Sequence, residues 1–120
     1  MNSRQDLEEA AKLASSLLDR TRDGKIEWTV LDEDQFVYST PRGIDFVVSG
    51  SDNGLGFRMQ DQGGHNLISV VTESGREYWE MAEGEAGLAE ALTPLYDLAR
   101  RSALKVDEKV SEISKYLESL

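Results

Sequence analysis

The first hydrophobic pattern in the chain has the period of an α-helix. Residues 4–22 place leucine and alanine three or four positions apart, which puts them on one helical face. Ser3 and Asp6 resemble a capping box at the start, and Gly24 suits the left-handed position that follows a helix. The pattern predicts an amphipathic helix over residues 4–22.

After Gly24 the hydrophobic period changes from 3.6 to 2. Alternating runs begin near Ile26, Phe36, Ile44 and Leu55, a further run covers residues 67–71, and residues 76–81 are a candidate sixth strand. Short acidic or glycine-rich turns separate the runs. Connections of this length favour an antiparallel meander, and the alternation predicts one packed face and one solvated face.

Two further amphipathic segments complete the chain. Pro94 interrupts the first, so a short turn followed by a helix from residue 94, with Thr93 as its cap, is one interpretation. In the second, Asp107 is the candidate cap and apolar residues are spaced 4-3-4-3, which is only two heptads. We expect this helix to pack on the first helix or on the sheet rather than to form a coiled coil.

Together these patterns predict an α+β fold in a single domain spanning residues 1–120. It has an antiparallel meander sheet of five to six strands, with an N-terminal helix and two C-terminal helices packed on one face. The length suits one domain, and hydrophobic residues make up 39% of it. The larger aromatic side chains are the expected core: Trp28, Phe36, Phe46, Phe57 and Trp79.

The chain has no cysteine, which excludes disulfides, thiol nucleophiles and cysteine-ligated metal sites. The first residues contain no apolar signal core, and no apolar run approaches the ~20 residues of a membrane span. We therefore expect a cytoplasmic protein without a membrane partner.

Acidic residues dominate the middle of the chain. The net charge is −10, and residues 23–80 carry eleven acidic and four basic residues, a net charge of −7. Such a surface repels nucleic acid and anionic lipid and attracts a basic protein. The alternative is that the acidity only keeps the protein in solution.

Motifs that support catalysis or cofactor binding are scarce. His65, the only histidine, lies in a glycine-rich turn and has no cysteine or second histidine to share a metal. The acidic run at residues 32–34 lacks the other ligands of a calcium loop, because a strand pattern follows it at once. We predict no catalytic residue, no metal ligand and no cofactor, and hence no enzymatic activity.

The remaining candidates are for binding a protein partner. A tryptophan among strands is usually a core residue, but on an open sheet face beside carboxylates it would anchor a partner. The candidate partner-binding residues are Trp28, Asp32, Glu33, Asp34, Glu77, Trp79 and Glu80.

Three segments together resemble a group of small, uncharacterised bacterial proteins. They are Gly24–Trp28, Phe36–Thr40 and Leu95–Leu104. The resemblance implies a bacterial origin and the same helix–meander–helix order. It implies no activity and no site residues.

Three functions follow as hypotheses. The first is a non-catalytic protein-binding module that uses the exposed sheet face or an edge strand. The second is an acidic inhibitor of a basic nucleic-acid-acting enzyme, either an immunity protein or a DNA mimic. The third is a small enzyme or ligand-binding protein with a site between sheet and helices. Homodimer formation through a sheet edge or the stripe at residues 106–120 is a further prediction.

Overall fold

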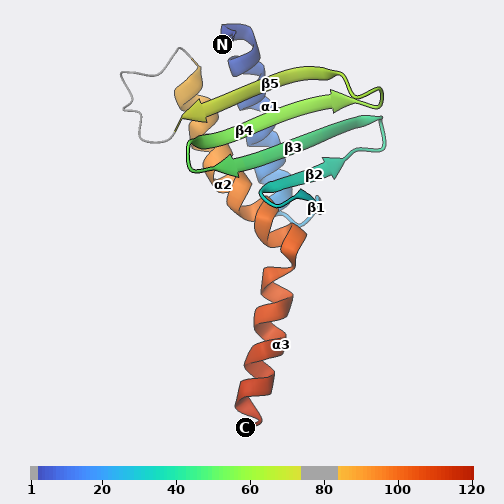
Figure 1. The fold of residues 1–120 in the computed structure, drawn as a ribbon, viewed down its shortest axis with the longest axis vertical. Helices are drawn as coiled ribbons and strands as arrows, with labels where there is room; N and C mark the ends of the chain where they lie inside the picture. Colours follow the sequence, from blue (N-terminus) through green and yellow to red (C-terminus); the bar gives the residue numbers. More distant parts are fainter. Residues whose placement is uncertain (1–2, 74–83) are drawn as a thin grey trace.

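The structure, a computed structural model, describes residues 3–73 and 84–120. Its elements are α1 (Arg4–Arg22), β1 (Thr29–Asp32), β2 (Gln35–Ser39), β3 (Ile44–Ser51), β4 (Gly54–Asp61), β5 (Asn66–Glu73), α2 (Glu85–Leu104) and α3 (Val106–Glu118). The strands form one antiparallel sheet in the order β1-β2-β3-β4-β5 (Figure 1). The predicted α+β class and meander are confirmed, while the candidate sixth strand at residues 76–81 lies outside the described residues.

Helices α1 and α2 form the second layer. Both lie behind the sheet in Figure 1, with α1 packed on α2 and β5, and α2 in contact with all five strands. The hydroxyl oxygen of Ser3 accepts a hydrogen bond from the Asp6 N–H at 3.0 Å, which satisfies one of the open donors at the start of α1. The predicted N-terminal helix and its cap are therefore confirmed.

The core fills the space between the two layers. Inward-facing strand residues meet the apolar faces of α1 and α2, and the Phe46 and Phe57 rings stack with centroids 6.0 Å apart. Phe36 packs against Tyr96 of α2 at 5.7 Å. Burying each large apolar side chain contributes about 1.5–3 kcal/mol, so this layer stabilises the domain.

Helix α2 runs through Pro94 without the break that the sequence suggests. Pro94 cannot donate a backbone hydrogen bond, which costs about 3 kcal/mol inside a helix. Leu92 and Leu95 on either side of it are both fully buried against the sheet and α1. Their burial requires one continuous helical face, so packing outweighs the cost of the proline.

Helix α3 does not pack on the sheet or on α1, contrary to the expectation for the last helix. It continues from the end of α2 and projects away from the body (Figure 1). None of its residues is buried. It begins at Val106, directly after Lys105, which has left-handed backbone angles (φ 54, ψ 45) and redirects the chain. Asp107 is thus not its cap but bonds to Arg101 of α2.

Candidate functional site

A groove of about 510 Å³ opens at the end of the sheet where three chain segments meet. The turn between β1 and β2, the hairpin between β3 and β4, and the end of β5 border it. In Figure 1 this is the end of the sheet at which the β3 and β5 arrows terminate. The groove therefore draws on strands that are up to about forty residues apart in sequence.

Small side chains hollow the sheet surface at this point. Ser49 pairs with Gln35 on one side and Gly56 on the other, and Gly56 pairs with Val71. A Cβ atom on Gly56 would lie 2.5 Å from the Ser49 hydroxyl oxygen, so a larger residue there would require the Ser49 side chain to move. The floor of the groove is consequently low, because serine and glycine occupy its centre.

The next cross-strand row shows the contrast. There Val37 pairs with Val47, and Val47 pairs with Arg58. Val47 is 1% exposed although it points away from the helices, so neighbouring side chains cover it. The outer face is filled at this row and hollow at the row of Ser49 and Gly56.

Carboxylates line the groove. Asp32, Glu33, Asp34 and Glu73 contribute to its wall, and none of the described residues that line it is Lys, Arg or His. The described side chains therefore give the groove a negative field, and the low-dielectric sheet beneath it concentrates that field.

Hydrogen bonds hold the acidic turn in place. The Asp32 carboxylate accepts from the Glu33 N–H at 2.8 Å, and the Gly50 N–H donates to the Asp34 carbonyl at 3.0 Å. Beneath the turn, burial and then the Asp34 charge raise the pKa of Tyr96 above its usual value, against a smaller opposite effect of Arg100. Asp34 therefore lies close enough to the Tyr96 hydroxyl to disfavour its ionisation.

Three of the predicted partner-binding residues meet in this groove, namely Asp32, Glu33 and Asp34. Glu77, Trp79 and Glu80 lie outside the described residues. The sequence did not indicate Ser49 or Gly56, because their role depends on cross-strand register. Alternation places both on one face, but only the pairing of β3 with β4 makes them neighbours.

Trp28 occupies a core position, so its prediction as a surface anchor is wrong. The side chain is 2% exposed. Its indole N–H donates to the Thr21 hydroxyl at 3.0 Å, and its backbone N–H donates to the Ser102 hydroxyl at 3.0 Å. The residue joins α1, the start of β1 and the end of α2, and cannot reach a partner in the folded protein.

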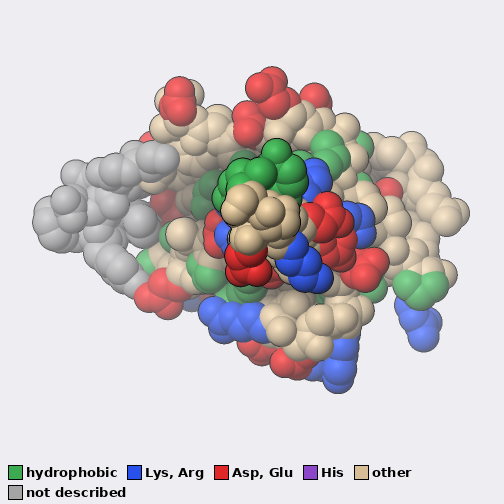
Figure 2. Space-filling model, turned by 90° about the horizontal axis from the view of Figure 1, so that it is seen from below, with side chains coloured by type: hydrophobic (Ala, Val, Ile, Leu, Met, Phe, Trp, Pro, Cys, Tyr) green, Lys and Arg blue, Asp and Glu red, His purple; other side chains and the backbone are tan. Residues whose placement is uncertain are grey.

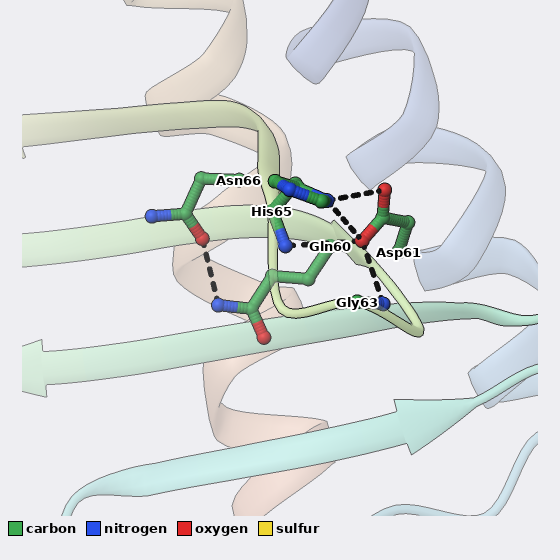
Figure 3. Close-up of polar contacts among 5 residues, drawn as sticks. All are labelled: Gln60, Asp61, Gly63, His65 and Asn66. Atoms are coloured by element: carbon green, nitrogen blue, oxygen red, sulfur yellow. Dashed lines mark hydrogen bonds and ion pairs between the residues drawn. The ribbon is translucent and has the colours of Figure 1, made fainter.

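His65 and Asp61 form a close pair in the turn between β4 and β5 (Figure 3). The His65 Nδ1 lies 3.1 Å from one Asp61 carboxylate oxygen, while the other oxygen accepts the backbone N–H groups of Gly63 and His65. The backbone bond from His65 leads the effects that lower the pKa of Asp61, with a smaller opposing effect of burial. Because Asp61 organises the turn and the imidazole is largely exposed, the pair has a structural explanation.

Residues 3–73 and 84–120 contain no cluster of metal-ligating side chains and no helix that could span a membrane. No group of three or more His, Asp or Glu side chains there is arranged to hold a metal ion. None of the described helices is long and apolar enough to cross a bilayer.

Comparison with protein families, curated proteins and solved structures gives no match. The resemblance to small bacterial proteins stays a prediction.

Proposed function

We propose that the protein is a non-catalytic protein-binding module whose acidic groove accepts a basic segment of a partner. One observation carries the proposal: carboxylates line a hollow whose described walls include no basic side chain. A volume of about 510 Å³ lies in the range of ligand-binding pockets.

The groove suits an extended segment with lysine or arginine side chains. Its floor of serine and glycine leaves room for the backbone of the bound segment to approach the sheet. Its acidic wall supplies partners for guanidinium or ammonium groups. Opposite charge speeds association and makes affinity depend on salt. A basic nucleic-acid-acting enzyme is one class of protein that presents such segments.

The interface between sheet and helices favours a binding role over a catalytic one. Apolar side chains from both layers fill it in the described part of the chain, with Phe36, Phe57 and Leu92 among the most buried. The groove instead opens at the end of the sheet, bordered by turns, and not between the two layers.

A peptide titration tests the proposal. The full chain is titrated with a fluorescent peptide of alternating arginine and glycine, and the anisotropy is measured at low and moderate salt. We expect saturable binding that weakens about tenfold between 50 and 200 mM salt. The variant Asp32→Asn/Glu33→Gln/Asp34→Asn should lose a further factor of about ten.

The matched control removes the same charge elsewhere. Glu108→Gln/Glu112→Gln/Glu118→Gln alters three exposed carboxylates of α3 and should change the dissociation constant less than about twofold. Equal losses in the two triple variants would show that net charge alone, and not the groove, attracts the peptide.

A further inference from the structure

Helix α3 has an exposed apolar face. Like the acidic groove, this face does not contribute to the packing of the domain. We define the α3 stripe as Val106, Val110, Ile113, Leu117 and Leu120. The last four of these side chains are 53–83% exposed. Figure 2 views the protein along α3 and shows hydrophobic side chains gathered on one side of the helix, with acidic and basic ones around the rest.

A helix of this kind is not stable alone in water. It has 13 residues, which is at the limit for an isolated helix, and α2 touches it only at its base. Burial of the stripe would supply the missing stabilisation. The spacing 4-3-4-3 is that of a helix that packs along a second helix.

We propose that the α3 stripe pairs, antiparallel, with the α3 stripe of a second copy of this chain about a two-fold axis. The side chains grow along the stripe, from valine at its base to isoleucine and leucine at its tip. In an antiparallel pair Val106 faces Leu117 of the second copy, and Val110 faces Ile113. Each larger side chain then meets a smaller one, which gives even packing along the line of contact between the two α3 helices, here called the seam.

The base of α3 offers an apolar surface for the tip of a second copy. A shallow, open hollow at the end of α2 and the start of α3 is lined by Leu104, Val106, Lys109, Val110 and Ile113. The tip carries the protruding leucines at positions 117 and 120. Because α3 is about 20 Å long, an antiparallel copy brings its tip to this hollow, and the two-fold axis repeats the contact.

The shape of the molecule argues against a parallel pair. Paired helices lie about 8–10 Å apart. The two shorter dimensions of the molecule are 36 and 25 Å, and body atoms surround α3 on every side in the end-on view (Figure 2). Parallel helices would force the two bodies into the same space, whereas antiparallel helices place them at opposite ends.

The charges beside the seam also suit this arrangement. Lys109 of one copy lies beside Tyr116 of the other, and Asp107 lies beside Ser114, so no two like charges meet there. Burying both stripes removes on the order of 1,000 Å² from water, at the lower end for specific interfaces. The pair should therefore be reversible, with a dissociation constant in the micromolar range.

Sedimentation equilibrium over concentrations from about 1 to 300 μM tests the association. We expect a monomer–dimer equilibrium. Ile113→Glu, which puts a charge at the centre of the seam, should raise the dissociation constant at least about 100-fold. The control Ser111→Glu adds the same charge on the polar face of α3 and should change it less than about threefold. A wild-type chain that stays monomeric throughout, or equal effects of the two variants, would overturn the proposal.

Disulfide trapping tests the direction of pairing, and the lack of native cysteine makes the assignment clean. Oxidation of a mixture of Val106→Cys and Leu117→Cys chains should give a covalent dimer that contains one chain of each kind. Each variant alone should remain largely unlinked, because a residue and its own copy are about 16 Å apart along an antiparallel pair. Efficient linking of Leu117→Cys chains to one another would show a parallel pair, and no linking in the mixture would show that the stripes do not meet.

Discussion

Helices α2 and α3 follow one another in the chain and carry similar amphipathic patterns, but they end in opposite environments. Leu88, Leu92 and Leu95 of α2 are fully buried, whereas Val110 and Ile113 of α3 are more than half exposed. A single residue, Lys105, separates the two helices and turns α3 away from the sheet. The comparison shows that an apolar stripe predicts a helix and the need for a partner surface, but does not say which surface it is.

The largest expected difference between the two helices is in stability. Leu92→Ala should lower the free energy of unfolding by about 2–5 kcal/mol, because it leaves a cavity in the core. Ile113→Ala in dilute, monomeric protein should change it by less than about 0.5 kcal/mol. Urea unfolding followed by tryptophan fluorescence measures both. Similar losses would mean that α3 is packed on its own chain in solution.

The contact between α2 and the sheet is so close that adding one methyl group to the sheet should disturb it. A Cβ atom on Gly50 would lie 2.5 Å from the Tyr96 ring, so Gly50→Ala should lower the free energy of unfolding by about 1–3 kcal/mol. Gly87→Ala on α2, whose new Cβ would meet only ordinary contacts, should raise it by about 0.5–1 kcal/mol. Thermal unfolding compares the two.

A second-site variant distinguishes the clash from other effects at Gly50. Tyr96→Ala removes the ring, so adding Gly50→Ala to it should have less effect than in the wild type. Additive losses would place the cause outside the contact with α2.

A substitution at the junction between α2 and α3 should have a smaller effect on the free energy of unfolding, and should stabilise the protein. Lys105 has a left-handed backbone (φ 54), a conformation that glycine adopts without strain. Lys105→Gly should raise the free energy of unfolding by about 0.5–1 kcal/mol, while Lys109→Gly inside α3 should lower the helix content seen by circular dichroism. A destabilised Lys105→Gly protein would mean that the lysine side chain itself holds the junction.

The smallest expected effect is on the loss of thermal stability at high pH, and it concerns a tyrosine on α2. Burial, and then the Asp34 charge, raise the pKa of Tyr96 above its ordinary value of 10.0. The neutral phenol therefore contributes stability that is present below about pH 10 and is lost as pH rises through the higher folded-state pKa. Tyr96→Phe should make the alkaline loss of thermal stability shallower. If Tyr116→Phe, on a ring that is 58% exposed, changed the profile by as much, the cause would lie outside the environment of Tyr96.

Local sequence determined the elements of this protein. The period of 3.6 and the Ser3 cap identify α1, and the period of 2 with its short turns identifies five antiparallel strands. These features depend on residues near one another in the chain, and backbone geometry converts them directly into helix or strand.

Tertiary structure decided what those elements meet. Cross-strand register brought Ser49 and Gly56 together and set the acidic turn beside them, which made the groove. Packing carried α2 through Pro94, buried Trp28 against Thr21, and left α3 without a buried residue. Hydrophobic burial is non-directional, so a periodic stripe specifies that a face must be covered, and only the arrangement of the other elements determines what covers it.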